Sequence, residues 1–397
     1  MSQIAVMLEK TKKHLAIILA VLVGLVLMAC GSSDMQGEGA DTSSDSNVQS
    51  SVSKEDNGAV MLPKNSTFSI KFIDVGQADA ALVECDGHYM LIDGGNKADS
   101  NLIYSVLKKA RVTHLDIVVG SHAHEDHIGG LPGAFNYADA SLTLCPVTNY
   151  DSDAFRDFKK YADRNGGGIV VPYVGDTYSL GSAVITVIGV NGGSDANDRS
   201  IVLKIQYGNT SFLFAGDAER EAELAIVDSG LDRSATVLKV GHHGSHTSTC
   251  YLFLRDIAPK YAVISVGSDN SYGHPTEETL SRLRDADVTV YRTDLQGDIV
   301  CTSDGENVRF KVEKNSSADT LSPPSVNVKP SAPVSTPKPS VNSSADKDYV
   351  GNKNSKKFHY DWCSSVKQMK ESNKFFYTGT REEMIGMGYD PCGNCHP

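Results

Sequence analysis

Three histidines and two acidic residues lie within six consecutive positions, 122–127, of this 397-residue chain. The segment reads Ser121-His122-Ala123-His124-Glu125-Asp126-His127-Ile128-Gly129-Gly130. In an extended segment His122 and His124 point to the same side, as two ligands of one ion must, and Asp126 and His127 can reach a second ion. Neutral imidazole and carboxylate groups suit zinc, manganese or iron. A solvated polar loop is the alternative, but such a loop needs no cluster of this kind.

Strand-like and helix-like segments alternate around this cluster, which directly follows an apolar run. Strands are expected over Phe68–Val75, Ala80–Glu84, Tyr89–Ile92, Leu115–Val119, Ala183–Val190, Ser200–Tyr207, Ser211–Ala215, Ala235–Val240, Tyr261–Val266, Thr289–Arg292 and Val308–Val312. Helices are expected over Ser100–Arg111, Ala218–Ser229 and Thr276–Ala286. This interleaving predicts a layered, mixed α/β domain that holds the cluster at the end of a buried strand.

The HxHxDH pattern followed by two glycines resembles the signature of the metallo-β-lactamase fold hydrolases. Other motifs narrow the resemblance to the extracellular hydrolase domain of the competence protein ComEC and its stand-alone relatives. These motifs are Phe72–Ala80, Leu91–Gly95, Phe214–Glu219, Leu238–Ser245, Ile264–Gly267 and Tyr272–Pro275. The resemblance runs from about Thr67 to Val312, and it implies an αββα sandwich with a two-metal site at one edge of the sheets.

The resemblance also implies metal ligands. His122 and His124 would bind the first metal, and Asp126 and His127 the second. Asp217 ends an apolar strand at a Gly-Asp turn and resembles the carboxylate that bridges the two ions. Taken alone, an aspartate after a strand is equally a cap or turn residue, so its motif carries this assignment.

The remaining ligand positions are less determined. His242 resembles the last ligand, with His243 the rival for that place, and Asp93 resembles the aspartate that hydrogen-bonds the ligand loops. Many members of the family have another histidine between positions 127 and 217, where this chain has none. The first metal would therefore have three protein ligands plus water or substrate, or gain Asn197, in the corresponding turn, as a weak partner. Zinc and manganese are both candidates for the two ions.

By resemblance the substrate is a phosphodiester, and for the ComEC branch it is DNA. Two ions about 3.5–4 Å apart activate water and clamp the phosphodiester oxygens. Asp126, His243 and His274 are the expected catalytic residues, and either of the two histidines would protonate the leaving oxygen. His274 is alternatively a turn residue. An enzyme acting on another ester, such as a phosphorylcholine esterase, is one alternative function, and a DNA-capture lipoprotein is the non-enzymatic one.

Residues 1–30 have the pattern of a lipoprotein signal peptide. A charged start precedes the apolar run Leu15–Ala29, which at 15 residues is shorter than the roughly 20 of a membrane span. The sequence Leu27-Met28-Ala29-Cys30 resembles a bacterial lipobox, in which Cys30 becomes the lipidated N-terminus. An uncleaved anchor helix is the alternative. Both place the protein at the extracellular face of a bacterial membrane, and a monomer is expected.

Changes in composition divide the rest of the chain into four parts. Residues 31–64 are rich in Ser, Gly, Asp and Asn, and residues 314–354 in Ser, Pro, Asn and Lys, so both are expected to be linkers. They bracket a hydrolase domain over 65–313 and separate a small module over 355–397.

The C-terminal module carries four soft metal ligands at short spacings. They are His359, Cys363, Cys392 and Cys395. So small a piece cannot build a sufficient core alone, which favours a structural zinc. The module resembles the zinc-binding domain of the Ada DNA-repair proteins, with His359 at the place of the methyl-accepting cysteine, so methyl transfer is not expected. A disulfide or free thiols at Cys392 and Cys395, and His396 as substitute ligand, are the alternatives.

The charge of the chain bears on its partners. It has 37 basic and 49 acidic side chains, a net charge of −12. The hydrolase domain alone has 21 basic against 34 acidic residues. Two divalent ions would return about four positive charges at the site. The composition therefore argues against strong, static DNA binding, while transient metal-centred hydrolysis stays compatible with it.

Overall fold

The computed structural model describes residues 62–324 and 347–397, except residues 394 and 396. The predicted signal peptide with Cys30, almost all of the first linker, and the middle of the second linker lie outside the described residues. Within the described ranges, no helix combines the length and the apolarity that crossing a membrane requires.

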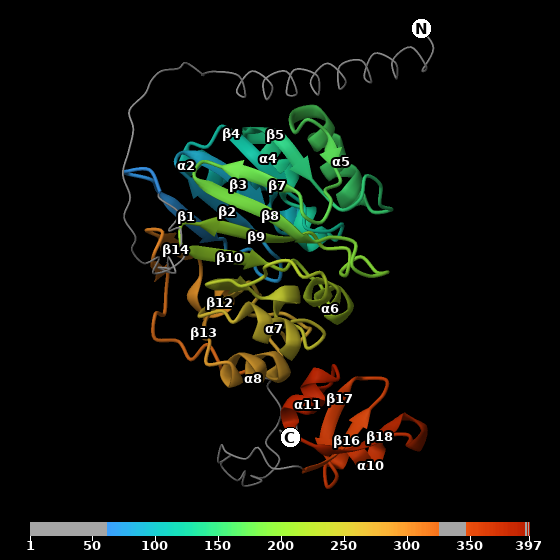
Figure 1. Ribbon diagram of the computed structural model, residues 1–397. Helices are drawn as coiled ribbons and strands as arrows, with labels where there is room; N and C mark the ends of the chain where they lie inside the picture. The colour runs from blue at the N-terminus through green and yellow to red at the C-terminus, as the bar shows by residue number, and fades with distance from the viewer. Residues whose placement is uncertain (1–61, 325–346, 394, 396) are drawn as a thin grey trace, which may run out of the picture. The chain divides into compact units, whose positions relative to one another are not determined.

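Two mixed β-sheets form the framework of the central domain (Figure 1). The eight-stranded sheet has the order β15 (Val308–Val312), β14 (Ile299–Ser303), β1 (Phe68–Phe72), β2 (Ala81–Cys85), β3 (His88–Ile92), β4 (His114–Val119), β5 (Asp139–Leu144), β6 (Ile169–Val170). The seven-stranded sheet has the order β13 (Thr289–Arg292), β12 (Tyr261–Ile264), β11 (Val237–Lys239), β10 (Thr210–Phe214), β9 (Val202–Tyr207), β8 (Ala183–Gly189), β7 (Thr177–Leu180).

The inner faces of the sheets pack together through apolar side chains from both. Phe68 of β1 stacks on Phe212 of β10 with ring centroids 4.8 Å apart, and Phe72 stacks on Phe214 at 5.7 Å. Alternate residues of each strand enter this core, which is the period-2 pattern that the sequence shows over β1. Each buried ring stabilises the sandwich by about 2–3 kcal/mol.

Helices cover the outer face of each sheet, through two further apolar clusters. The eight-stranded sheet carries α2 (Ser100–Ala110), α3 (Glu125–Ile128), α4 (Leu131–Tyr137) and α5 (Asp153–Asn165). The seven-stranded sheet carries α6 (Arg220–Asp228), α7 (Tyr251–Ile257) and α8 (Glu277–Asp285), and the short α9 (Thr293–Gln296) follows β13. The predicted αββα sandwich is therefore confirmed.

Several elements had no counterpart in the sequence prediction, notably β5, α5, β6, β7, α7 and β14. For α5 the signal was present, because Phe155, Phe158 and Ala162 recur at helical spacing and Ser152 accepts a hydrogen bond from the backbone N–H of Phe155 as the N-cap. The strands β6 and β7 are short and partly exposed, so they have little apolar pattern to detect.

Parallel strands bring distant loops to one edge of the sandwich. In the eight-stranded sheet β3 is parallel to β4, and in the other sheet β10, β11 and β12 are mutually parallel. The carboxyl ends of parallel strands meet at one edge, where backbone groups leave the ladder and side chains can converge. The loops after β3, β4, β10 and β11 carry Asp93 and the predicted metal ligands of the central domain, while Asn197 follows β8 and His274 follows β12.

The C-terminal module is a second, smaller sheet. Its strand order is β18 (Lys374–Gly379), β16 (Lys347–Asn352), β17 (Lys357–Tyr360), β19 (Asp390–Pro391), with α10 (Ser364–Gln368) and α11 (Arg381–Gly386). The strand β16 lies between β17 and β18, although its residues were predicted to belong to the linker. The module thus begins earlier than residue 355, because its central strand is supplied by the end of the Ser/Pro-rich segment.

The predicted linker also begins too early. Residues beyond 314 still pack on the central domain, where the carbonyl oxygens of Leu321 and Ser322 accept hydrogen bonds of 2.6 Å from Arg284 and Arg292. Satisfying these backbone groups holds the segment against β13 and α8.

Four cysteines are scattered through the central domain. Cys85, Cys145, Cys250 and Cys301 are buried, and none of them forms a disulfide. Burial raises the pKa of the Cys145 and Cys301 thiols to about 12, so both stay protonated and act as small apolar residues.

Candidate metal centre

Four of the predicted residues converge at the edge of the sandwich. Asp126, His127, Asp217 and His243 each offer a ligand atom, and these atoms lie within 4.8 Å of one another. His127, Asp217 and His243 are almost completely buried. Asp126 and His127 stand on α3, Asp217 follows β10, and His243 follows β11. The group includes His243, which the sequence analysis gave as the alternative to His242.

The donor set fits a divalent cation. Among the described residues, the buried atoms His127 Nε2, Asp217 Oδ1 and His243 Nε2 have no hydrogen-bond partner. The other ring nitrogens are occupied, because His127 Nδ1 lies 2.9 Å from Asp93 Oδ2 and His243 Nδ1 donates to the Ser265 carbonyl at 3.0 Å. Two imidazole nitrogens and one carboxylate oxygen are therefore buried close together without hydrogen bonds, which is costly unless a cation binds them.

His122 and His242 lie near the second oxygen of Asp217, and His124 contacts His122. His122 Nε2 lies 4.0 Å from Asp217 Oδ2 and 3.0 Å from His124 Nδ1. His242 Nε2 lies 3.7 Å from the same oxygen, while its Nδ1 faces Glu219 Oε1 at 3.1 Å. His242 and His243 therefore both lie with Nε2 3.7 Å from Asp217 Oδ2, but only His243 belongs to the group whose ligand atoms lie within 4.8 Å of one another.

The backbone around these ligands is strained. His242 and His243 have φ of 49° and 53°, and Asp93 has φ of 57°. Such positive φ values are unfavourable for non-glycine residues, so the surrounding contacts must hold these residues in place. Residues of this kind cluster at functional sites. Gly216, with φ of 55°, makes the turn that places Asp217, and a Cβ there would lie 3.0 Å from Ser200.

Asp93 orients the ligand loop, as the resemblance implies. Its Oδ1 accepts a hydrogen bond of 2.7 Å from the Ser121 backbone N–H, and its Oδ2 lies 2.9 Å from His127 Nδ1. One buried carboxylate thus fixes both the start of the histidine segment and the tautomer of a histidine within it.

Asp93→Asn is expected to lower metal affinity and activity by about 10- to 100-fold, because an amide can accept from only one of the two donors through its oxygen. Metal titration followed by calorimetry measures the effect. Asp139→Asn is the matched control, because Asp139 pairs with His114 at 3.1 Å in an exposed position. Equal metal affinities for the two variants would show that Asp93 does not orient the site.

A buried ion pair supports the site from behind. Lys239 Nζ lies 2.8 Å from Asp79 Oδ2, with side-chain exposures of 4% and 7%, and Asp79 Oδ1 lies 3.3 Å from His243 Nδ1. Burial opposes the charge on Asp79, but Lys239, His243 and His127 together outweigh it and lower the pKa of the carboxyl. Both residues lie within the motifs Phe72–Ala80 and Leu238–Ser245, but no role was predicted for either; a lysine inside an apolar strand is the signal that could have identified the pair.

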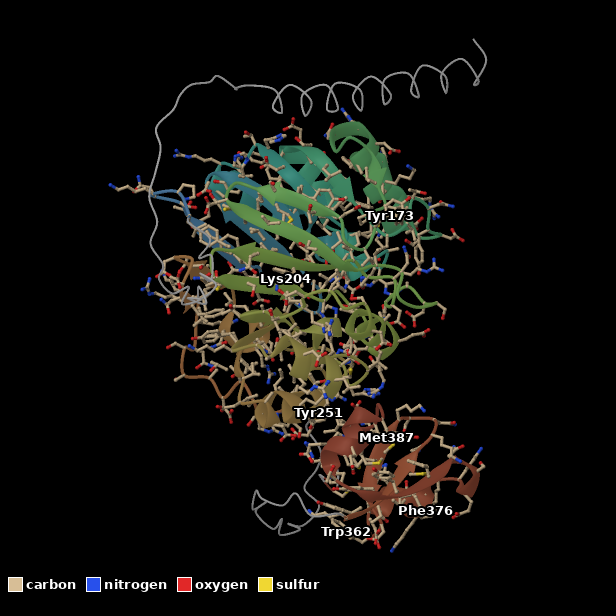
Figure 2. All side chains as sticks on the ribbon, viewed as in Figure 1. Tyr173, Lys204, Tyr251, Trp362, Phe376 and Met387 are labelled. Atoms are coloured by element: carbon tan, nitrogen blue, oxygen red, sulfur yellow. The ribbon has the colours of Figure 1, made fainter. Side chains whose placement is uncertain are left out.

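Lys239→Met is expected to destabilise the domain by about 3–5 kcal/mol, because it leaves the Asp79 charge buried without its partner. Urea unfolding measures this loss. Lys204→Met is the control: Lys204 (labelled in Figure 2) is similarly buried, but its partner Asp232 is 74% exposed, so the cost of losing that pair is about 1 kcal/mol or less. Adding Asp79→Asn to Lys239→Met should recover part of the stability; no recovery would rule out the unpaired charge as the cause.

Without bound ions, the buried carboxylates and imidazole groups of the site shift one another's pKa values. Burial opposes protonation of His243, but Asp217 and Asp79 outweigh it and raise its pKa to about 10. The same balance, with Asp217 and Asp93 as partners, raises the pKa of His127 well above its usual value. The cationic histidines in turn lower the pKa of Asp126 to about 2. A metal must displace these protons, so metal binding releases protons and strengthens as pH rises.

His274 and Asn197 lie next to the ligands rather than among them. The His274 ring meets the His242 ring at 5.7 Å, and burial together with the neighbouring histidines lowers the pKa of His274 to about 4. The imidazole is therefore neutral at pH 7, which disfavours the predicted role of proton donor. Asn197 Nδ2 donates to Glu219 Oε1 at 3.3 Å, which places it behind His242. Its role as a weak metal partner and the acid role of His274 stay predictions.

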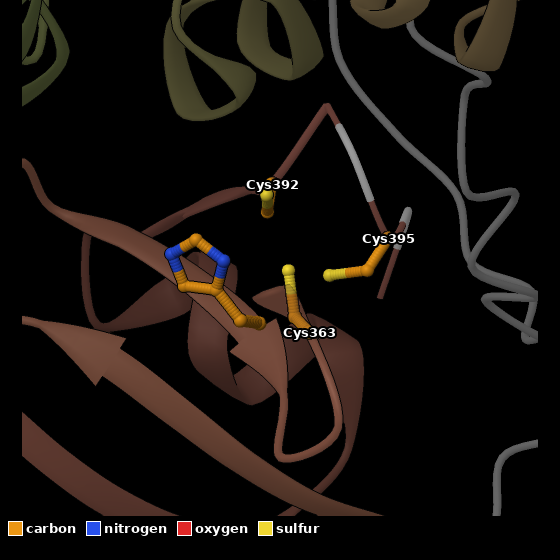
Figure 3. Close-up of side chains that lie close together, drawn as sticks. Cys363, Cys392 and Cys395 are labelled. Carbon is orange, nitrogen blue, oxygen red and sulfur yellow. The ribbon is translucent and has the colours of Figure 1, made fainter. Parts of the chain in front are cut away.

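The C-terminal module forms a separate candidate site. His359, Cys363, Cys392 and Cys395 offer ligand atoms within 4.8 Å of one another, and Figure 3 shows the three sulfur atoms turned toward a common centre. No disulfide joins Cys392 and Cys395. A hydrogen bond with Cys392 and burial raise the pKa of Cys395, a penalty that a bound cation removes. His396 lies outside the described residues.

Comparison with known proteins agrees with this geometry. Residues 73–268 match the family model described as Metallo-beta-lactamase superfamily. The chain carries a metallo-beta-lactamase superfamily domain. The match spans every residue of the centre except His274, and it includes Asp79 and Lys239. The domain therefore belongs to a superfamily of metal-dependent hydrolases.

Curated relatives connect the domain to competence proteins. The chain is 28% identical over 250 residues to ComE operon protein 3 of Bacillus subtilis, covering 58% of this chain and 32% of the relative. It is 29% identical over 238 residues to competence protein ComA of Neisseria gonorrhoeae, covering 59% and 32%. A shorter match, 31% identical over 102 residues and covering 24% and 27%, is to zinc phosphodiesterase ELAC protein 1 of Bos taurus. The chain spans about a third of the length of the competence proteins that it matches.

Proposed function

We propose that this protein is a metal-dependent phosphodiesterase that cleaves DNA outside the cell. The observation that carries the proposal is the position of Asp217, whose two oxygens lie within 4.0 Å of His122, His127, His242 and His243. A buried carboxylate placed between two imidazole groups is the arrangement that bridges a pair of divalent ions.

Two ions bound at this site would share Asp217. His122, His124 and His242 would hold one ion with Asp217, and Asp126, His127 and His243 the other; His242 thereby takes the place of the histidine missing between positions 127 and 217. When bound, zinc or manganese supplies Lewis-acid activation of water and of phosphate oxygens. The chain's own contribution is orientation, through Asp93, Glu219 and the Ser265 carbonyl, each of which contacts a ligand histidine.

The names of the relatives support the substrate class. Two of them are competence proteins, and a third is named a zinc phosphodiesterase. DNA is a phosphodiester polymer available outside cells, and a metal-centred site can engage it transiently despite 21 basic against 34 acidic residues in the domain. DNA is therefore the proposed substrate, and another ester is the alternative substrate.

Location and the C-terminal module complete the proposal. Lipidation of Cys30 would tether a monomer to the extracellular face of the bacterial membrane, and the segment between the lipid and the sandwich would act as a spacer. One zinc ion held by His359, Cys363, Cys392 and Cys395 would stabilise the Ada-like module.

The decisive experiment assays the purified full chain with Mn²⁺ or Zn²⁺ on single- and double-stranded DNA, beside p-nitrophenyl phosphorylcholine. Metal-dependent DNA cleavage that chelation abolishes is expected. DNA left intact with both metals while the choline ester is cleaved would replace the nuclease with an esterase. DNA bound but never cleaved, with the ester also intact, would support a capture protein instead.

A further inference from the structure

The loop between β12 and α8 carries an exposed aromatic ring beside the metal centre. Tyr272 is 71% exposed, and its ring lies nearly parallel to that of His274, with an interplanar angle of 24° and centroids 5.6 Å apart. His274 meets His242 edge to face at 5.7 Å. His242, His274 and Tyr272 thus form a row of rings that leads from Asp217 to the surface.

The loop that presents this ring is braced. Asn270 Oδ1 accepts a hydrogen bond of 2.9 Å from the His274 backbone N–H, and Asn270 Nδ2 donates to the carbonyls of His274 and Gly267 at 2.8 and 2.7 Å. His274 is 8% exposed, so the inner face of the Tyr272 ring rests on a fixed partner. A ring held in place before a ligand arrives loses little freedom when it binds one.

The flat, uncharged ring of Tyr272 suits the face of a nucleobase. Single exposed tyrosines are common on proteins, but this one is stacked on a histidine that contacts a candidate ligand histidine. The domain has 34 acidic and 21 basic residues, so its hold on a polyanion cannot come mainly from charge. Base stacking on an aromatic side chain is independent of charge and tolerates any sequence, because every base has a π-face.

We propose that Tyr272, supported by His274, is a nucleobase-stacking subsite that holds an unstacked base next to the scissile phosphate. This inference rests on the proposed phosphodiesterase function and deepens it, because it names single-stranded nucleic acid as the preferred substrate. In a duplex the base would first have to leave its partner and its neighbours, which costs free energy that a single strand does not require.

The test compares two single-stranded oligodeoxynucleotides of equal length, one with all its bases and one whose central residues are abasic. Their backbones and charges match, so a difference in Kd or KM reports base contacts alone. The full-length protein and its Tyr272→Ala, Tyr272→Phe and Tyr173→Ala variants are measured with Mn²⁺ by cleavage, and without metal by fluorescence anisotropy. Tyr173, labelled in Figure 2, is 77% exposed and has no ring partner among the described residues.

Tyr272→Ala is expected to raise Kd and KM for the base-bearing strand about 10-fold, to leave the abasic strand unchanged, and to leave kcat nearly unchanged. Tyr272→Phe, which keeps the ring, and Tyr173→Ala should behave like the unmodified protein. Equal discrimination between the two strands by Tyr272→Ala and the unmodified protein, in both assays, would overturn the subsite. If neither strand is cleaved, the proposed function fails, and the anisotropy measurement alone decides the stacking proposal.

Discussion

Asp217→Asn is expected to lower kcat for phosphodiester cleavage by about 10³-fold or more. The carboxylate of Asp217 faces both imidazole sets, so replacing it with an amide removes the anion that would hold two cations at the separation that in-line displacement requires. Metal ions supply several kcal/mol of transition-state stabilisation in such sites, and each 1.36 kcal/mol is a factor of ten in rate.

Two further measurements separate this effect from loss of the fold. Bound metal, determined by elemental analysis of the purified protein, should fall in Asp217→Asn, while urea unfolding of the metal-free variant should stay cooperative. Asp228→Asn, at the exposed end of α6, is the matched control and should keep full activity. An Asp217→Asn variant that retains turnover would rule out the two-metal site.

Cys363→Ser is expected to remove one zinc ion per chain and to unfold the C-terminal module, leaving the central domain folded. The module has two small apolar clusters, and one of them is built around the thiols of Cys363, Cys392 and Cys395 themselves. So little core cannot offset the chain entropy of about 50 ordered residues, whereas structural zinc contributes about 10–16 kcal/mol of folding free energy at pH 7.

Zinc stoichiometry and limited proteolysis test this expectation in the full chain. New cleavage sites should appear within residues 347–397 and at no position in the sandwich. Cys301→Ala, a buried cysteine of the central domain with no place in either metal group, should keep the zinc of the module. An unchanged zinc content in Cys363→Ser, with the module still resistant to protease, would show that the module needs no metal.

The sequence predicted those parts of the site that lie close together along the chain. His122, His124, Asp126 and His127 occupy one segment after a buried strand, so the ligand types and their spacing are visible without a fold. Asp217 was recognisable only through its motif, because an isolated carboxylate after a strand has several ordinary roles. The αββα sandwich followed from the same motifs, since the alternation of strands and helices alone permits several layered folds.

The partners of those ligands could not be predicted because they depend on strand pairing. Asp79 and Lys239 are 160 positions apart and meet only where the two sheets face each other. Tyr272 lies beside the site because Asn270 Nδ2 donates hydrogen bonds to the carbonyls of Gly267 and His274, which hold the loop in its folded-back conformation. Spacing along the chain carries no information about either contact.

The chemistry of the centre was therefore determined by the sequence itself, through the types of its ligands and the order of its motifs. The tertiary structure decided how the adjacent histidines of the Gly-His-His-Gly turn are oriented. With φ of 49° and 53°, His242 and His243 both aim Nε2 at Asp217, and Glu219 and the Ser265 carbonyl fix their rings separately. Identical neighbouring residues can be told apart only by the partners that three-dimensional packing supplies.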